Sequence, residues 1–521
     1  MEIKDMDFKL INTKNYLSKI KPTLFDDIGI LTLFDEVYDH SWMDLQDVME
    51  FLVDKDEILR RQAIFTDFLN DDKDNLRAFK RLCDVCLDSF KSYLSSDSDI
   101  KSYISIVIFY SRYVNFINEG SNILNELNFE SNELNEMKKY FSEMKNDAKF
   151  INFGVEVDKC LASIQKMTKM VISFIHDEPY MYENTNETSE GVKTIEELLL
   201  SYADKLTIHP IMRESNYSRH IMDSYFYNRY EYVFSEDYSL IRKFFYNYSD
   251  ECNYNFEILS NNLNYYLKFK MLFEEAKSND VAFSKVTFNN EHYADFKNLS
   301  DITIMRHAHK ITPNDCVWNE AEHVQIITGA NGGGKTTYCR SIGANFVIMN
   351  SVGYCFATYA CINPIKYLHT HFPNDENYVV GYGRLHDEIV RLDRIREDFC
   401  EDCLVLLNET FSSTDEDTAL KESLKLLEEI DEKKVPLIFI THQQKLLDVI
   451  DRTKIALLNP VVDPENNNRR TFKIRRVGNV INSYAEDILR KYGLSRDQLM
   501  TRLEDLKASK EEKEGEVNED K

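Results

Sequence analysis

Residues 329–337 have the composition and spacing of a loop that binds phosphate. The run Gly329, Ala330, Asn331, Gly332, Gly333, Gly334, Lys335, Thr336 and Thr337 fits the pattern G-x-x-x-x-G-K-[ST]. Glycines let backbone N–H groups approach a phosphate, and the positive end of a following helix attracts the anion. Lys335 would reach the β- and γ-phosphates, and the Thr336 hydroxyl would ligate Mg²⁺. The pattern predicts a nucleoside triphosphate site; the alternative is a glycine-rich turn with a chance lysine.

Three more polar residues follow apolar runs further along the chain. Asn408 and Glu409 come directly after residues 404–407, and His442 follows residues 435–440. A carboxylate at the end of such a strand can hold Mg²⁺ or activate the attacking water. We therefore predict Glu409 as the catalytic base and a metal ligand, and His442 as a sensor of the γ-phosphate. Asn408 is predicted as a weak or indirect Mg²⁺ partner, because an amide oxygen adds no negative charge. The alternative for His442 is a purely structural role.

The sequence pattern around these residues predicts that an α/β domain positions them. Residues 324–327, 403–407 and 435–440 are continuous apolar runs, as expected for strands of a sheet covered on both faces. Helices are predicted over residues 336–349, 385–396 and 418–432, a strand over 301–305, and a hairpin from 455–458 and 471–477. The pattern predicts a P-loop ATPase domain over residues 301–482, with a mixed, mainly parallel sheet.

The chain before this domain has helical periodicity. Apolar side chains recur at helical spacing in residues 54–69. Two longer rows of mainly apolar side chains at helical spacing follow, which we call seams. The seams are Val157, Leu161, Ile164, Thr168, Val171 and Ile175, and then Phe256, Leu259, Leu263, Leu267 and Met271. We predict an all-α region made of a helical core over residues 1–90 and a lever or clamp arm over 91–300, with a polar insertion at 177–197. The alternative is an ordinary helical bundle without a moving part.

Composition limits the classes of partner. The chain of 521 residues carries a net charge of −26, whereas proteins that coat nucleic acid usually present a basic field. Aromatic and arginine side chains alternate over residues 217–248, where we favour packing over a patch that contacts nucleic acid. No apolar stretch has the roughly 18 residues that a membrane span needs, so we expect no membrane contact and a cytoplasmic protein. Cys83 and Cys86 form an isolated C-x-x-C, from which we predict no metal site.

Residues 326–338 and the upstream Pro313-Asn314-Asp315 resemble the MutS family of DNA-repair ATPases. Further similar stretches are residues 353–357, Ile365, Thr370, 404–409, Thr414, 441–442, 483–484, 493–499 and, weakly, 56–62. The resemblance implies an ATPase that uses ATP and Mg²⁺, a lever of long helices, and a homodimer with composite ATP sites. It also implies a carboxy-terminal helical dimerisation segment, which would occupy residues 483–506. We expect residues 507–521 to be a disordered charged tail.

Departures from the family pattern shape the functional hypothesis. The chain begins near the family's core domain, so we expect the amino-terminal module that reads mispairs to be absent. The family's Ser-Thr stretch that reaches the partner's nucleotide falls near Gly383 and Arg384, and Asn408 replaces an aspartate. The main hypothesis is an ATP-driven dimeric clamp on DNA in repair or recombination, which recognises shape rather than sequence. The alternatives are an ATP-gated dimeric switch that acts on a protein partner and a member that binds ATP without hydrolysing it.

Overall fold

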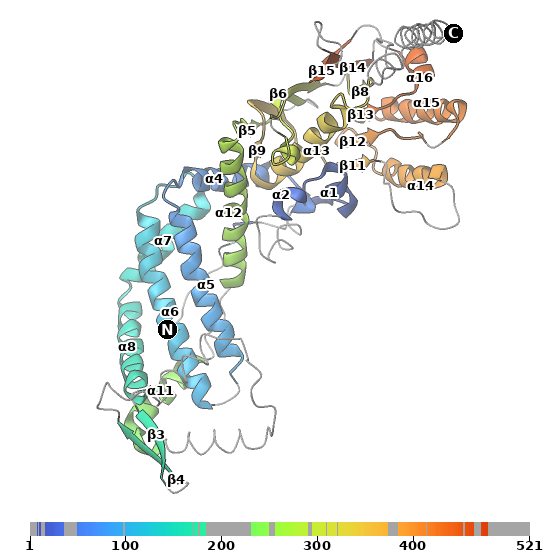
Figure 1. Ribbon diagram of the computed structural model, residues 1–521. Coiled ribbons are helices and arrows are strands. Elements are labelled where there is room, and N and C mark those ends of the chain that lie inside the picture. Colours follow the sequence, from blue (N-terminus) through green and yellow to red (C-terminus); the bar gives the residue numbers. More distant parts are fainter. Residues whose placement is uncertain are drawn as a thin grey trace, which may run out of the picture. The chain divides into compact units, whose positions relative to one another are not determined.

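The fold is described from a computed structural model (Figure 1). It describes residues 8, 10–11, 16–35, 49–96, 99–168, 170–175, 178–183, 231–249, 256–289, 294–308, 310–319, 321–372, 384–412, 414–451, 454–462 and 470–477. The chain divides into two compact units, residues 1–11 with 63–268 and residues 12–62 with 269–521. Each unit is described by itself. The predicted dimerisation segment and tail, residues 483–521, lie outside the described residues.

The first unit is built mainly from helices. They are α5 (Asn75–Leu94), α6 (Asp99–Asn125), α7 (Asn132–Asn146), α8 (Ala148–Thr168), α11 (Ser235–Tyr248) and the first half of α12 (Phe256–Ser278) (Figure 1). Aromatic rings fill its core: Phe141 lies 5.1 Å from both Phe79 and Phe116 between ring centroids. A Cβ at Gly120 would lie 2.9 Å from Phe79 and 3.0 Å from Phe141, so α6 uses glycine to let these rings pack against its backbone.

The predicted seam after Val157 ends earlier than its spacing indicated. Val157 and Ile164 are buried on α8, but the helix stops at Thr168. Val171 and Ile175 belong instead to β3 (Met170–Ile175), which pairs antiparallel with β4 (Glu178–Glu183). The prediction of helix through residue 175 was wrong because β-branched and aromatic side chains dominate this run and favour a strand. The second predicted helix, over residues 256–271, is confirmed by α12.

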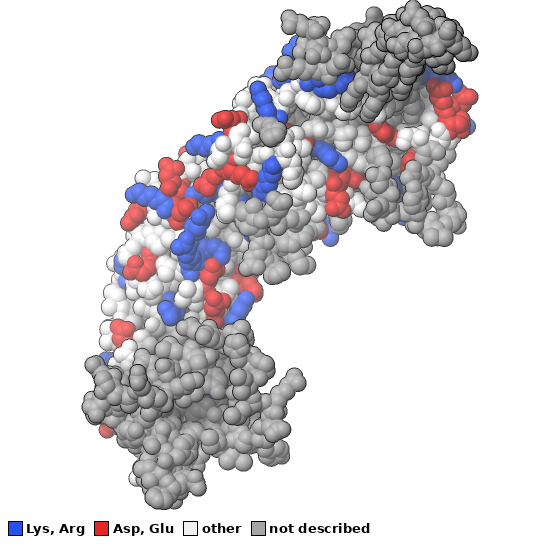
Figure 2. Space-filling model, viewed as in Figure 1, with Lys and Arg blue, Asp and Glu red and all other residues white. Residues whose placement is uncertain are grey.

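Only the end of the aromatic and arginine-rich run over residues 217–248 lies within the described residues. Phe244 of α11 packs against Phe153 with 5.9 Å between ring centroids, and Arg242 pairs with Glu231 at 3.7 Å. These contacts agree with packing in this part of the run. On the visible described surface, positive and negative side chains are interspersed (Figure 2).

The amino-terminal part of the second unit is not wholly helical. Strand β1 (Tyr16–Lys19) pairs antiparallel with β2 (Phe51–Val53), and between them lie α1 (Pro22–Ile28) and α2 (Thr32–Asp35). The expectation of an all-α region up to residue 300 therefore needs correction here, at β3–β4 and at the strands over residues 284–287 and 294–299, because strands this short carry too little periodicity to detect. The helix predicted over residues 54–69 is confirmed by α4 (Lys55–Asn70).

A five-stranded sheet in the order β7-β6-β10-β5-β9 covers one side of the second unit's core. Its strands are β5 (Ser284–Thr287), β6 (Ala294–Leu299), β7 (Asn314–Trp318), β9 (Tyr354–Cys355) and β10 (Tyr359–Ile362). The strand predicted over residues 301–305 is wrong, since residues 302–304 form a 3₁₀ helix. The Asp301 carboxylate accepts from the Thr303 N–H at 2.9 Å, and this local hydrogen bond competes with strand pairing.

A six-stranded sheet has the order β11-β12-β13-β8-β14-β15. Its strands are β8 (Val324–Ile327), β11 (Tyr367–His371), β12 (Cys403–Asn408), β13 (Leu437–Ile440), β14 (Ile455–Val462) and β15 (Arg470–Arg476). All neighbouring pairs are parallel except β14–β15, which is antiparallel. This arrangement agrees with the predicted mainly parallel sheet and its hairpin.

Four helices accompany this sheet: α13 (Lys335–Val352), α14 (Arg384–Arg396), α15 (Glu416–Glu432) and α16 (Gln444–Val449). Helix α13 is buried almost all round, because it contacts both sheets. A Cβ at Gly343 would lie 2.9 Å from Leu406 of β12, and the Phe346 ring lies 6.0 Å from that of Phe296 on β6. Within the described part of the chain, no helix is both long and apolar enough to cross a membrane.

Candidate functional site

The register of the six-stranded sheet brings the predicted site residues to one edge. Ile440 of β13 pairs with Asn408 of β12 on one side and with Ile327 of β8 on the other. Because the three strands are parallel, their carboxyl ends meet, and the next residues follow from the same level. The glycine-rich loop after β8 (residues 329–334), Glu409 after β12 and His442 after β13 therefore face one region.

The glycine-rich loop needs its glycines for two different reasons. Gly329, Gly332 and Gly334 have φ values of 131°, 71° and 93°, a region that side chains disfavour. At Gly333 the constraint is space, since a Cβ would lie 2.8 Å from Pro460 and 3.0 Å from the carbonyl oxygen of Ala330. Gly334 is also the N-cap of α13, so the loop passes directly into the first turn of that helix. Backbone N–H groups at such a turn are suited to an anion.

Lys335 is buried at the centre of the loop. Its Nζ donates to the carbonyl oxygens of Gly329 at 2.7 Å and Ala330 at 3.2 Å, and to Asn331 Oδ1 at 3.3 Å. Burial lowers the pKa of Lys335 to about 8; the charge of Glu409 opposes this shift and that of Arg470 adds to it. Lys335 is thus held in the loop as a partly desolvated cation. A bound phosphate group would offset the free-energy cost of burying its charge.

His442 lies between Lys335 and Glu409. Its Nε2 is 3.2 Å from Lys335 Nζ and 3.4 Å from Glu409 Oε1. Burial, and then the charge of Lys335, lower the pKa of His442, while Glu409 opposes the shift, so the ring is neutral at physiological pH. A single nitrogen cannot accept from the ammonium and donate to the carboxylate at once. Because Lys335 is mostly protonated below its pKa, we assign the proton to Nδ1 and the acceptor role to Nε2.

The loop that carries Glu409 has an unusual backbone without glycine. Glu409 and Phe411 have φ values of 52° and 64°, in the left-handed region. Neighbouring elements hold them there: Glu388 Oε2 of α14 accepts from the Phe411 N–H at 3.0 Å, and His371 Nδ1 lies 3.0 Å from Thr410 Oγ1. Burial lowers the pKa of His371 to about 3, which keeps this imidazole neutral. Strained backbone that the surroundings enforce is typical of functional loops.

Asn408 has a side-chain oxygen that could accept a hydrogen bond or bind a cation. Its Oδ1 is buried and has no hydrogen-bond partner in the described part of the structure, a cost of about 1–3 kcal/mol for a buried acceptor. Oxygen ligands suit Mg²⁺, and Thr336 places a half-buried hydroxyl in the first turn of α13. No group of three or more His, Cys, Asp or Glu side chains among the described residues could hold a metal alone. The donor set therefore fits a cation that arrives with phosphate oxygens.

Comparison with known proteins identifies the domain that carries this edge. Residues 325–500 match the family model for MutS domain V, which covers the glycine-rich loop, Glu409 and His442. The chain is therefore similar to the MutS family in this domain. Its similarity to curated members is partial. It is 24% identical to the DNA mismatch repair protein MutS of Chlorobium chlorochromatii over 208 residues, 39% of this chain and 24% of that protein.

Two further MutS relatives align over shorter segments. The DNA mismatch repair protein MutS of Methanothrix thermoacetophila is 31% identical over 136 residues, 26% of this chain and 16% of that protein. The protein named DNA mismatch repair protein MutS 2 of Halobacterium salinarum is 26% identical over 184 residues, 35% of this chain and 21% of that protein. The chain thus aligns with about a quarter or less of the length of these relatives.

The sequence did not reveal how the hairpin β14–β15 contributes to the site. Pro313-Asn314-Asp315 were recognised, but the structure shows what Asn314 contacts. Its Nδ2 donates to the carbonyl oxygen of Phe472 at 3.1 Å, and its Oδ1 accepts from the Ile474 N–H at 2.8 Å. A Cβ at Gly334 would lie 3.5 Å from the Phe472 ring, so β15 lies beside the glycine-rich loop. The charge of Arg470 on the same strand acts on Lys335.

Of the two residues predicted to lie near the partner's nucleotide, Arg384 begins α14 and Gly383 lies outside the described residues. After the Glu409 loop, Asp415 caps α15, where its carboxylate accepts from the Thr418 N–H at 3.0 Å. Which residue would complete the partner's site stays a prediction. The thiols of Cys83 and Cys86 are buried and their pKa values are raised, in agreement with a structural role.

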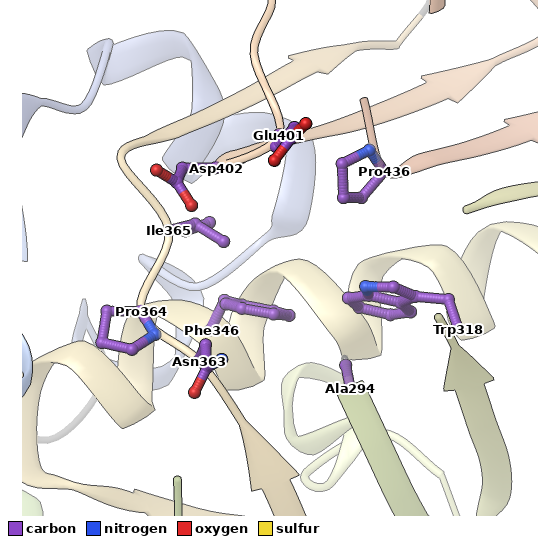
Figure 3. A pocket seen from close by; sticks show the side chains of 9 residues that line it. All are labelled: Ala294, Trp318, Phe346, Asn363, Pro364, Ile365, Glu401, Asp402 and Pro436. Atoms are coloured by element: carbon purple, nitrogen blue, oxygen red, sulfur yellow. The ribbon is translucent and has the colours of Figure 1, made fainter. Parts of the chain in front are cut away.

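A small cavity elsewhere in the second unit is distinct from this site. Trp318, Phe346, Pro364 and Asp402 are among the residues around it, and the sticks in Figure 3 surround a narrow slot. The Trp318 and Phe346 rings stack with 5.9 Å between centroids. The volume of about 30 Å³ accommodates one or two water molecules. It is too small for a nucleotide and belongs to the packing of α13.

Proposed function

We propose that the edge formed by the glycine-rich loop, Glu409 and His442 binds ATP with Mg²⁺ and hydrolyses it. The observation that carries this proposal is the contact of one imidazole with both partners, His442 with Lys335 at 3.2 Å and with Glu409 at 3.4 Å. A cation and a carboxylate beside a helix N-terminus are groups that phosphoryl transfer to water uses, and the neutral imidazole lies between them. The MutS domain V match over the same residues supports it.

Each residue has a chemical role in this proposal. The loop N–H groups and Lys335 bind the phosphates. Glu409 orients the attacking water and accepts its proton while the bond between the γ-phosphorus and the bridging oxygen breaks. His442 senses the γ-phosphate, because its Nε2 can leave Lys335 and, once the ring proton has moved from Nδ1 to Nε2, donate to a phosphate oxygen. Thr336, Asn408 and Glu409 would hold Mg²⁺, which neutralises charge that develops on the phosphate oxygens.

We further propose that ATP turnover drives a dimeric clamp on DNA. The relatives that share domain V carry the name DNA mismatch repair protein, which favours DNA over other partners. In this proposal the helical segment 91–300 is the lever or clamp arm, 301–482 the ATPase domain and 483–506 the dimerisation segment. Two copies would form composite ATP sites. Contact with DNA shape is proposed rather than base reading.

A switch that acts on a protein partner is the competing function. The net charge of −26 and the mixed charges on the visible surface (Figure 2) favour it, since phosphate binding needs a local basic area. A gel shift at low salt with perfect duplex, mispaired and branched DNA distinguishes the two functions. We expect a shift that is larger with ATP and strongest for a distorted DNA. No shift with any of the three would exclude the clamp and leave the switch.

The ATP proposal is tested on the purified chain by nucleotide affinity and phosphate release. Lys335→Ala should reduce ATP affinity by about a hundredfold, because a charge-assisted contact to two phosphates is lost. Lys425→Ala is the matched control, since Lys425 is exposed on α15. Equal affinity in the two variants would contradict the assignment of the glycine-rich loop.

A further inference from the structure

A second cavity in the same compact unit has a lining rich in positive charge. It lies beside the edge strand β11, between α1 and α14, and has a volume of about 230 Å³. Its polar lining consists of Lys21, Thr23, His369, Thr370, Arg391 and Arg394. No carboxylate of a described residue lines it, which is unusual in a chain with 89 acidic and 63 basic residues. Such a lining is suited to an anion.

Arg391 is fixed in the wall of this cavity. Its Nη2 donates to Asp27 Oδ2 at 2.6 Å and to the carbonyl oxygen of Thr370 at 3.1 Å. The Thr370 hydroxyl donates to the same Asp27 oxygen at 2.6 Å. Asp27 is only 5% exposed, and burial raises its pKa although Arg391 opposes this shift. Asp27 therefore balances one positive charge and holds the guanidinium in place.

The two other cations of the lining are not balanced in this way. Neither Lys21 nor Arg394 forms an ion pair with a described residue, and both side chains are exposed at the cavity rim. A second acidic residue beside the lining, Asp398, lies 3.0 Å from His369 Nε2. His369 is neutral, because burial and then the charge of Lys21 lower its pKa to about 4. Lys21 and Arg394 thus place two positive charges at the cavity that no ion pair with a described residue balances, and one carboxylate, Asp398, lies next to neutral His369.

We propose that this cavity binds a small molecule that carries a phosphate monoester. A phosphate monoester has a charge of about −1.5 to −2 at neutral pH, which matches two uncompensated cations. The volume of about 230 Å³ exceeds the needs of a bare phosphate, and Leu24, Leu368 and Ile395 offer apolar contact to an organic group. Lys21 and Arg394 bind the phosphate, and Thr23 donates a hydroxyl.

The test uses the full chain with Lys335→Ala, so that phosphate binding at the glycine-rich loop does not contribute. Inorganic phosphate and phenyl phosphate are titrated by calorimetry at low salt. We expect both to bind, phenyl phosphate more tightly because its ring contacts the apolar wall. Lys21→Gln and Arg394→Gln should each weaken phenyl phosphate by about tenfold, as expected for loss of a charge-assisted contact.

Two controls keep the result interpretable. Lys425→Gln removes an equally exposed cation on α15 and should leave the affinity unchanged. Thermal melts of the two rim variants should match the parent, because neither side chain has a described ion-pair partner. Absence of binding, or unchanged affinity in the double variant Lys21→Gln/Arg394→Gln, would overturn the proposal. Neither outcome bears on ATP hydrolysis, since the cavity proposal does not depend on it.

Discussion

The loops after β8 and after β12 reach unusual backbone conformations by opposite means. The first uses glycine, with Gly329, Gly332 and Gly334 at positive φ. The second places Glu409 and Phe411 there, and Glu388 and His371 contact the loop from α14 and β11. The backbone conformation of the glycine-rich loop follows from its own glycines. That of the Glu409 loop depends on residues distant in the sequence. The conformation of the glycine-rich loop is therefore determined by its local sequence, whereas the position of Glu409 depends on tertiary contacts.

Among the changes that test the backbone of the two loops, the largest effect is expected in the glycine-rich loop. Gly334→Val should reduce ATP affinity by roughly ten- to a hundredfold, because φ of 93° strains a β-branched residue at the start of α13. Gly332→Asn is the matched control: asparagine tolerates φ of 71°, and a Cβ there meets nothing within 4 Å. ATP affinity is measured by calorimetry. A loss of the same size in both variants would mean that local backbone conformation does not explain the loop.

The second prediction concerns the loop that depends on tertiary contacts. Glu388→Ala removes the acceptor of the Phe411 N–H and should lower the rate of phosphate release by about tenfold, with ATP affinity kept. Glu388→Gln retains an acceptor oxygen and should recover much of the rate. Stopped-flow phosphate release and calorimetry separate the two quantities. If the alanine variant turned over normally, Glu388 would have no part in positioning Glu409.

The third prediction is a pH dependence of ATP affinity that belongs to the first loop and amounts to less than about twofold near neutral pH. The pKa of Lys335 is lowered to about 8, and bound phosphates would raise it again. Below pH 8 the lysine is charged in both states, so affinity is constant. Above pH 8 binding must take up a proton, so ATP affinity should fall by up to about tenfold per pH unit.

Titrations from about pH 7 to about pH 9.5 measure this dependence. Lys335→Arg keeps the charge at every pH and should give a flat profile even if its affinity is lower. A flat profile in the parent chain would show that Lys335 is not the titrating group.

The same contrast explains how much the sequence could predict. The glycine-rich loop, strands β8, β12, β13 and β14 and helices α4, α12, α13, α14 and α15 were predictable, because glycine spacing and continuous apolar runs are local signals. Strand β11 of the same sheet was not predicted. Strands β3 and β4 were missed because a helical seam extended by chance into a β-branched run. The contacts of Glu388, Asn314 and Phe472 could not be predicted, since they depend on pairings between distant segments.

The central claim is that Glu409 performs the chemistry while the glycine-rich loop performs the binding. Glu409→Gln keeps the size of the side chain but removes the base, and exposed Glu428→Gln on α15 is its control. The decisive measurement is single-turnover phosphate release from bound ATP. We predict at least about a hundredfold slower release in Glu409→Gln, with ATP affinity within about twofold of the parent. Equal release by Glu409→Gln and the parent would contradict the account.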